Sequence, residues 1–342
     1  MKQGRRAASG GQPVEFGFSL PSRGPLAKPS ILVRLTRKAE ALGYSCVTVS
    51  DHVVLPTRSS APYPYSPTGE FPGGAHQDYL EPLALMAWLL AATRRLRVGT
   101  SVLVVPYRNP VVTAKQLATL DVLSGGRVIV GCGAGWWPEE FQALAAPPFA
   151  ARGAVTDEYI RLMKEVWTRD APSFSGKHYQ LHDVTLFPKP VQKPHPPIWI
   201  GGHGPGALRR AGELGDAWHP IGLRPPAGLP PAEYAEKAQQ VRAHAARAGR
   251  RSEAILLSLR APLEIWPARP TRSGKAEGGS RAMLQGNPLR GPAEKVAGDI
   301  RAYRRAGVQS FVFDFTEQDP GAMVETMERF AEEVRPRVTR AR

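Results

Sequence analysis

The sequence predicts an α/β protein of the TIM (β/α)8 barrel class, with insertions in the loops at the C-terminal face of the barrel. Short β-branched runs alternate with amphipathic helical segments along nearly the whole chain, the pattern of repeated βα units around a parallel sheet. Eight such units can be counted, and eight is the number at which a parallel sheet closes on itself. A closed barrel is therefore favoured over an open doubly wound sheet.

The first half of the chain supplies four of these units. Apolar residues alternate over 14–20 and predict the first strand, and the helix after it is expected to begin with Ser30 as its N-cap and to stop at Gly43. The next predicted elements are, in order, a strand at 46–50, a helix at 81–93, a strand at 98–105, a helix from Pro110 to Gly125-Gly126 and a strand at 127–131.

The second half continues the alternation after a glycine-spaced turn. The predicted helices are a short one near Pro138 and longer ones at about 156–168, at 231–248 and at 320–334. A hairpin is expected over 173–187, and the remaining strands are expected at 198–200, 217–219, 255–265 and 310–315.

One domain accounts for this pattern. Residues 13–335 are expected to form the barrel, after a disordered leader at 1–12 and before a basic tail at 336–342. Insertions are expected at 53–78, 170–197 and 266–292. Long loops inside a compact domain usually serve function or are disordered, so the insertions are expected to shape a binding site.

The composition excludes several classes of protein. With 42% hydrophobic and 22% charged residues, the chain is of ordinary globular composition. Its longest uncharged apolar run, 83–92, is shorter than the roughly 18 residues that a membrane span needs, so we expect no membrane association and a cytoplasmic location. Cys46 and Cys132 lie far apart in apolar runs, which predicts neither a zinc site nor a disulfide framework, and no metal site is expected.

The net charge of +15 invites a nucleic-acid interpretation. The basic residues are, however, scattered along helical segments, and no nucleic-acid-binding motif accompanies them. A small anionic ligand explains the charge equally well, and no nucleic-acid partner is expected.

Two segments at predicted strand ends can carry chemistry, because the working face of such a barrel is built from the loops after its strands. Asp51-His52 follows the second strand, where a neutral imidazole can accept or relay a proton, although a purely structural role for the pair is also open. The segment Gly201-Gly202-His203-Gly204 follows the fifth strand and opens a helix, which makes a candidate phosphate site.

A third segment, Gly131-Cys132-Gly133-Ala134-Gly135, follows the fourth strand, and its alternate glycines allow backbone to approach a flat ligand. Glu139 and Glu140 come next and are interpreted as residues of a helix start rather than catalytic groups. His203 and His219 also fall at strand ends, and both are treated as residues with satisfied hydrogen bonds.

Four longer segments together resemble the luciferase-like flavin-dependent oxidoreductase superfamily, specifically its deazaflavin branch that uses coenzyme F-420. They are 49–56 (VSDHVVLP), 100–110 (TSVLVVPYRNP), 120–128 (LDVLSGGRV) and 196–202 (PPIWIGG). The resemblance covers nearly the whole chain, from 14 to 334. It implies a barrel that holds a flavin-type ring across the strand mouths, and a homodimer.

The resemblance also implies roles for single residues. Asp51 and His52 would approach the deazaflavin, with His52 handling a proton beside the hydride-carrying carbon. The Ser101–Val102 bond matches the family's non-prolyl cis peptide, which supports the ring from behind. The remaining implied cofactor contacts are those of Ala134 and Gly135 with the ring and tail, and those of Gly201, Gly202, His203 and Gly204 with the phosphate.

One departure from the family concerns the substrate. In the family's sugar-phosphate dehydrogenases a glutamate follows the Gly-x-Gly-x-Gly run as general acid, whereas Trp136 stands there in this chain. Trp136 and Trp137, with Tyr63 and Tyr65 from the long loop, would line an aromatic pocket suited to a flat or apolar substrate, although core packing under a lid explains them equally well.

Three functions are therefore carried forward. The first is an F-420-dependent oxidoreductase that transfers hydride between the deazaflavin and a small carbonyl or unsaturated substrate. The second is an FMN-dependent monooxygenase that uses reduced flavin and oxygen. The third is a non-catalytic flavin-binding barrel.

Overall fold

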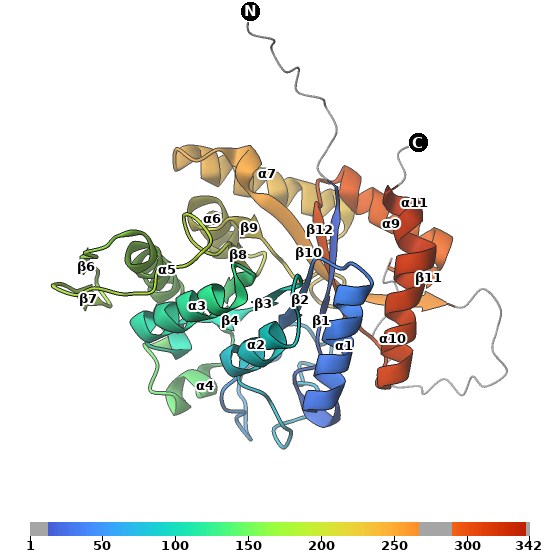
Figure 1. Cartoon of the computed structure of the whole chain (residues 1–342), viewed down its shortest axis with the longest axis horizontal. Helices are drawn as coiled ribbons and strands as arrows, with labels where there is room; N and C mark the ends of the chain where they lie inside the picture. The colour runs from blue at the N-terminus through green and yellow to red at the C-terminus, as the bar shows by residue number, and fades with distance from the viewer. Residues whose placement is uncertain (1–12, 267–288, 340–342) are drawn as a thin grey trace, which may run out of the picture.

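The structure is a computed structural model, which describes residues 13–266 and 289–339 of the 342-residue chain. The predicted leader at 1–12 lies outside the described residues, as do most of the insertion at 266–292 and the last residues of the predicted tail. The rest of the chain is shown in Figure 1.

Eight parallel strands close into a barrel, which confirms the predicted fold class. They are β1 (Glu15–Ser19), β2 (Cys46–Val49), β3 (Arg97–Thr100), β5 (Val128–Gly133), β8 (Ile198–Ile200), β9 (Ala217–Trp218), β10 (Leu256–Trp266) and β12 (Ser310–Phe315). Each strand pairs with the next in this order, and β12 also pairs with β1, so the ring has no gap among the described strands. Two short strands, β4 (Leu103–Val104) and β11 (Arg290–Pro292), extend the sheet beside β5 and β10.

Helices follow the strands and surround the barrel (Figure 1). They are α1 (Pro29–Ala41), α2 (Pro82–Ala91), α3 (Pro110–Ser124), α4 (Pro138–Ala143), α5 (Arg152–Thr168), α6 (Pro205–Leu214), α7 (Pro231–Arg247), α9 (Ala293–Arg305), α10 (Pro320–Arg329) and α11 (Arg335–Thr339). Most of them begin with proline, whose fixed φ suits the first helical turn and whose missing N–H is not needed there.

Three helix boundaries differ from the predictions. Ser30 is not the N-cap of α1, because Pro29 already occupies the first helical position and Lys28 precedes it. Helix α5 begins at Arg152, four residues earlier than expected. The last helix continues through a π turn at 330–334 into α11. Part of the predicted tail is thus helical, and Val338 is buried in it.

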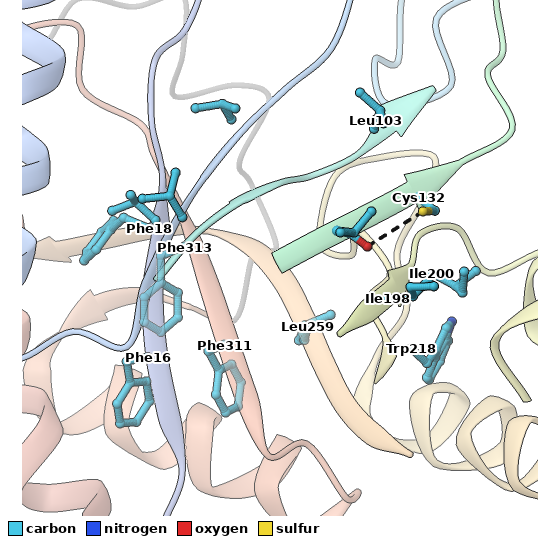
Figure 2. Close-up of a cluster of buried hydrophobic side chains, with 14 of the residues drawn as sticks. Phe16, Phe18, Leu103, Cys132, Ile198, Ile200, Trp218, Leu259, Phe311 and Phe313 are labelled. Carbon is cyan, nitrogen blue, oxygen red and sulfur yellow. Dashed lines mark hydrogen bonds between the residues drawn. The ribbon is translucent and has the colours of Figure 1, made fainter. Parts of the chain in front are cut away.

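The larger core lies between the barrel and its helices. Phe16 and Phe18 of β1 stand beside Phe311 and Phe313 of β12, with ring centroids 5.7–6.1 Å apart (Figure 2). Phe330, just beyond α10, packs against the same rings at 4.8–4.9 Å. Because successive residues of a strand point to opposite faces, these phenylalanines place the intervening residues inside the barrel.

The barrel interior is apolar in one part and polar near the C-terminal ends of the strands. Away from the C-terminal ends of the strands, the interior is filled by a small separate apolar cluster. Its members are Cys46, Ile129, Trp199, Ala217 and Val312. On β10, Ser258 and Arg260 follow Leu256 at steps of two residues and therefore share its inward face. On β12, Asp314 follows Val312 in the same way. The interior thus becomes polar toward the mouth, where a site is expected.

The predicted third strand is broken in two. The peptide bond between Ser101 and Val102 is cis, which confirms the expectation from the family resemblance, and it separates β3 from β4. A Cβ atom on Gly133 would lie 2.4 Å from Val102, and one on Gly201 would lie 2.7 Å from it. These two glycines therefore make room for the Val102 side chain as well as for any ligand.

Gly131 is the position where a side chain is least tolerable. A Cβ there would lie 1.9 Å from the backbone oxygen of Thr100, and the Thr100 hydroxyl donates to the Gly131 carbonyl at 2.7 Å. We expect Gly131→Ala to lower the free energy of unfolding by about 3 kcal/mol or more, because two strands must separate. Gly298→Ala in α9 is the control and is expected to stabilise by up to about 1 kcal/mol. Equal denaturation midpoints for both variants would contradict this packing.

The predicted insertions take two forms. The segment after β2 runs over the barrel mouth before α2, and the hairpin of β6 (Phe174–Ser175) and β7 (Gln180–Leu181) forms a separate antiparallel pair. Among the described residues, no helix is both long and apolar enough to span a membrane.

Candidate active site

A cavity of about 640 Å³ opens at the C-terminal end of the barrel. Its wall is formed mainly by the loops after β2, β3, β5, β8 and β9, with Arg260 of β10, at the face that the sequence predicts as the working face. Most of the predicted site residues lie on this wall: Asp51, His52, Tyr63, Tyr65, Ser101, Val102, Ala134, Gly135, Trp136, Gly201, Gly202 and Gly204. Segments more than 150 residues apart in the chain thus meet around one space.

His52 lies on the cavity wall with one ring nitrogen fixed. Its Nδ1 lies 2.6 Å from Oε2 of Glu140, in the first turn of α4. Its Nε2 forms no hydrogen bond with any residue in the described part of the chain. Because His52 is only slightly exposed and borders the cavity, Nε2 is the ring atom available to a bound molecule.

Glu140 is the functional residue that the sequence analysis missed. It is fully buried, and its carboxylate also accepts from the Val53 and Val54 amides at 2.7 and 3.3 Å and from the Tyr107 hydroxyl at 2.8 Å. With three other donors converging on it, the carboxylate acts as acceptor toward His52 as well, so the Nδ1 atom carries the ring proton. In the neutral ring, Nε2 is then the atom that can accept a proton. The helix-start interpretation of Glu140 was incomplete, because its partners lie more than 30 residues away.

Asp51 is held by partners on both of its carboxylate oxygens. Its Oδ2 accepts from the Val104 amide at 2.8 Å, and Arg108 holds both oxygens at 2.7 and 2.9 Å. Arg108 also pairs with Glu81 at 2.9 Å. Burial raises the pKa of Asp51, and the bidentate Arg108 guanidinium opposes that rise. The carboxylate thus joins the end of β2 to β4, and the catalytic role of Asp51 stays a prediction.

Aromatic rings form the wall beside His52. Phe71, Tyr79 and Trp136 lie with ring centroids 5.1, 5.2 and 6.1 Å from the imidazole. Tyr63 continues this wall, 5.3 Å from Trp136 and 5.7 Å from Tyr65. Burial raises the pKa of Tyr65 to about 12, so this phenol stays neutral. The predicted aromatic pocket is therefore present around Nε2.

Trp137 does not line the cavity, contrary to the prediction. It is buried behind Trp136, on which it stacks at 4.6 Å, and its Nε1 donates to the Ser59 hydroxyl at 2.9 Å. Adjacent residues at the start of α4 point in different directions, so only one of the two tryptophans can face the space. Core packing is the correct interpretation for Trp137.

The opposite part of the wall suits a ring and an anion. Gly135 has φ +83°, and a Cβ there would lie 2.7 Å from Phe141, so only glycine keeps this loop close to the cavity. Gly202 has φ +88°, and Gly204 precedes α6. At the start of this helix Pro205 has no N–H and the Ala207 amide donates to the Gly204 carbonyl at 2.9 Å, which leaves the Gly206 amide without a hydrogen-bond partner among the described residues. Arg152 and Arg210 also border the cavity, and Arg210 is paired with the Asp157 carboxylate. We call this part of the wall the anion-binding end, because a helix N-terminus and an arginine suit an anion.

His203 is the exception at the anion-binding end. It is half-buried but is not on the cavity wall, and its carbonyl oxygen accepts from the Lys237 ammonium at 3.3 Å. The prediction that the His203 side chain binds the cofactor is therefore not supported.

Under the Ser101–Val102 bond lies a buried polar network. His219 Nε2 is 2.9 Å from the Ser101 hydroxyl and its Nδ1 is 2.8 Å from that of Ser258, as expected for a satisfied histidine. Arg260 donates to both the carbonyl and the hydroxyl of Ser101 and pairs with Asp314 at 2.8 Å. Burial, followed by the Arg260 charge, lowers the pKa of His219 to about 3.

This shift makes stability depend on pH. His219 binds a proton near pH 6.5 when unfolded but only near pH 3 when folded, so its contribution is complete above 6.5 and is lost as the pH falls. We expect the free energy of unfolding to drop between pH 6 and 4 with a slope from this residue approaching about 1.4 kcal/mol per pH unit. Denaturant titrations of His219→Gln should show a shallower slope, and identical slopes would contradict the assignment.

The cavity thus combines a buried acid–histidine pair, an aromatic wall and an anion-binding end on a parallel barrel, which defines an oxidoreductase-type site for a flat anionic cofactor. The model of the luciferase-like monooxygenase family matches residues 14–270, and the chain belongs to this family.

Three curated relatives show the range of the family. An uncharacterized protein of Mycobacterium tuberculosis is 39% identical over 188 residues, covering 54% of this chain and 63% of the relative. An F-420-dependent glucose-6-phosphate dehydrogenase of Kineococcus radiotolerans is 33% identical over 212 residues, covering 61% and 56%. An FMNH(2)-dependent dimethylsulfone monooxygenase of Pseudomonas putida is 42% identical over 133 residues, covering 38% and 36%. The matches span less than two thirds of each relative.

Solved structures show the same fold over almost the whole chain. An F-420-dependent secondary alcohol dehydrogenase in complex with an F-420–acetone adduct superposes with a TM-score of 0.75 at 20% identity, covering 96% of this chain and 99% of that one. The monooxygenase RslO1 from Streptomyces bottropensis superposes with a TM-score of 0.73 at 22% identity, covering 94% and 99%. The family therefore contains both F-420-dependent enzymes and flavin monooxygenases.

Proposed function

We propose that this protein is a coenzyme F-420-dependent oxidoreductase that transfers hydride between the deazaflavin and a small carbonyl or unsaturated substrate. One observation carries the proposal: a single cavity joins His52, whose Nε2 has no hydrogen-bond partner among the described residues, to the anion-binding end at Arg152 and the Gly206 amide of α6. A redox cofactor with a flat ring and an anionic side chain needs both parts. When bound, the reduced deazaflavin would supply the hydride.

The chain's own residues would bind, orient and exchange a proton. Ser101, Val102, Ala134 and Gly135 would face the ring, and Gly201, Gly202 and Gly204 would leave space for the phosphate. Reduction of a carbonyl also needs one proton at the substrate oxygen. We assign this proton to Nε2 of His52, which accepts it in the oxidation direction and returns it in the reduction direction.

The charge at the anion-binding end favours F-420 over FMN. Arg210 is paired with Asp157, but Arg152 forms no ion pair in the described part of the chain and would be available to the several carboxylates that the F-420 side chain carries beside its phosphate. Titration of the purified protein with F-420, FMN and FAD, followed by fluorescence quenching, tests this choice. We expect F-420 to saturate the protein at a lower concentration than either flavin. A preference for FMN would overturn the choice of F-420 as the cofactor.

An FMN-dependent monooxygenase is the second candidate. The local identity of 42% to the dimethylsulfone monooxygenase favours it. It predicts that reduced FMN with a substrate consumes oxygen in the presence of this protein, and that F-420 does not bind. Oxygen consumption with reduced FMN and binding of F-420 are measured on the same preparation. Binding of either cofactor without turnover of any carbonyl or sulfur substrate would instead favour the non-catalytic barrel.

The expected homodimer and cytoplasmic location remain part of the proposal. Helices α2 and α3 lie side by side on the outside of the barrel (Figure 1) and expose large apolar side chains, namely Trp88, Val112, Val122 and Leu123. Exposed apolar side chains of this size are common at subunit interfaces. Light scattering after size-exclusion chromatography is expected to give twice the mass of the chain.

A further inference from the structure

Two guanidinium groups share one carboxylate on the cavity wall. Arg260 of β10 holds Oδ1 of Asp314 through Nε and Nη2, each at 2.8 Å, and its Nη1 donates to Ser101. Arg224, in the loop after β9, reaches Oδ2 of Asp314 at the longer distances of 3.1 and 3.3 Å. Every nitrogen of Arg260 is therefore engaged, whereas Nη1 of Arg224 has no hydrogen-bond partner among the residues of 13–266 and 289–339.

This group carries an excess of positive charge. Burial raises the pKa of Asp314, but the charges of Arg260 and Arg224 outweigh it and lower the pKa to about 2, so the carboxylate is ionised. The neighbouring His219 is neutral at pH 7, because burial lowers its pKa to about 3. Two guanidinium groups against one carboxylate leave one positive charge, and no other acidic side chain in the described part of the chain pairs with Arg224 or Arg260.

The excess charge lies in the half of the cavity that contains His52. Arg260, Tyr63 and Tyr79 lie on the same cavity wall, and the Tyr79 ring is 5.2 Å from that of His52. Arg224 and Arg260 border the same cavity and come from the loop after β9 and from strand β10. The arginines of the anion-binding end, Arg152 and Arg210, come instead from α5 and α6.

The wall of this half is otherwise aromatic, and a third arginine lies on it. The guanidinium of Arg23 is 5.0 Å from the centroid of the Phe71 ring, and its Nη1 donates to the carbonyl of Pro72 at 2.6 Å. In the described residues, Arg23 forms no ion pair. The His52 half thus presents apolar rings together with two incompletely paired guanidinium groups.

We propose that the substrate carries a carboxylate on an apolar or aromatic body, and that Arg224 binds this carboxylate while the aromatic wall holds the body. A planar guanidinium fork matches a carboxylate in two-point geometry, and an excess charge in a half-buried cavity is stabilised by an anion. This inference rests on the proposed function only in taking the His52 half of the cavity as the substrate half. The inference narrows the predicted class of substrate, a flat or apolar molecule, to one that carries a carboxylate.

The test compares two probes of one shape. Binding of trans-cinnamate and trans-cinnamamide to the F-420-loaded protein is measured by calorimetry, with benzoate and benzamide as a smaller matched pair. A charge-assisted hydrogen bond contributes about 1.5–3 kcal/mol, so we expect the acid of a pair to bind about ten to a hundred times more tightly than its amide. Arg224→Gln should abolish this preference. Arg152→Gln, at the anion-binding end, should weaken F-420 but keep the preference.

Several outcomes would overturn the proposal. They are equal binding of acid and amide by the unaltered protein, no detectable binding of either acid, and a preference that survives Arg224→Gln in a variant with an unchanged melting temperature. Weakened F-420 binding with an unchanged preference would assign Arg224 to the cofactor instead. Failure of F-420 to bind would count against the proposed function alone, because the same preference for the acids is expected in the protein without cofactor.

Discussion

Replacing His52 with alanine is expected to lower kcat by about 10²- to 10⁴-fold, the usual contribution of a positioned acid–base group. Cofactor affinity should change little, because Nδ1 is directed at Glu140 and only Nε2 is available in the cavity. Turnover is measured from the rise in F-420 absorbance as the carbonyl substrate oxidises the reduced cofactor, and affinity from fluorescence titration. The two readouts separate loss of chemistry from loss of binding.

His52→Asn is the matched control for this prediction. The asparagine amide can place a donor near the position of Nδ1 and keep the hydrogen bond to Glu140, but it has no atom at the position of Nε2. We expect it to fold normally and to lose turnover as fully as the alanine variant. Wild-type turnover in either variant would remove His52 from the reaction.

Glu140→Gln is expected to have the second largest effect, a fall in kcat of about 10- to 100-fold, the usual cost of losing a partner that orients a functional side chain. The glutamine oxygen can still accept from the Val53 and Val54 amides, but its amide would donate toward Nδ1 of His52. That donation places the ring proton on Nε2, the wrong atom for accepting one.

A change in kcat without a change in KM distinguishes this role from a merely structural one. The melting temperature of Glu140→Gln should stay close to that of the unaltered protein, since the side chain keeps its shape. Glu140→Asp keeps the carboxylate and should recover part of the turnover. If kcat is unaffected, or if KM and kcat worsen together with a large loss of stability, Glu140 does not act through His52.

The fold could be predicted because each βα unit has a local signal. Alternating apolar residues such as those of 14–20, followed by an amphipathic segment and a glycine, determine the element type and its place in the repeat. The interruption of the third strand has no clear signal in its own residues, since 98–105 contains no proline or charged residue and is typical of one continuous strand. The resemblance to a known family located it at Ser101–Val102, and the structure confirms it.

The site could be predicted only where its residues directly follow strands. Asp51, His52 and Gly202 do so, and the barrel brings them to one cavity. Glu140 could not be found in this way, because its donors, His52 and Tyr107, lie 88 and 33 residues away. The tryptophan pair shows the same limit, because the loop before α4 decides which ring faces the cavity.

The pairing of Arg260 with Asp314 could have been predicted from the sequence. Arg260 and Asp314 each interrupt an apolar strand, at positions where alternation directs the side chain into the barrel. A charged residue inside a strand of a closed barrel must be paired or face a ligand. Both conditions hold here, since Arg260 pairs with Asp314 and borders the cavity.

A crystal structure of the protein with bound F-420 would test the central claim most directly. The account predicts the deazaflavin ring against the Ser101–Val102 bond within reach of Nε2 of His52, and the phosphate among the first amides of α6 beside Arg210. A ring bound outside this cavity, or a phosphate placed at Arg224 beside the aromatic wall, would contradict it.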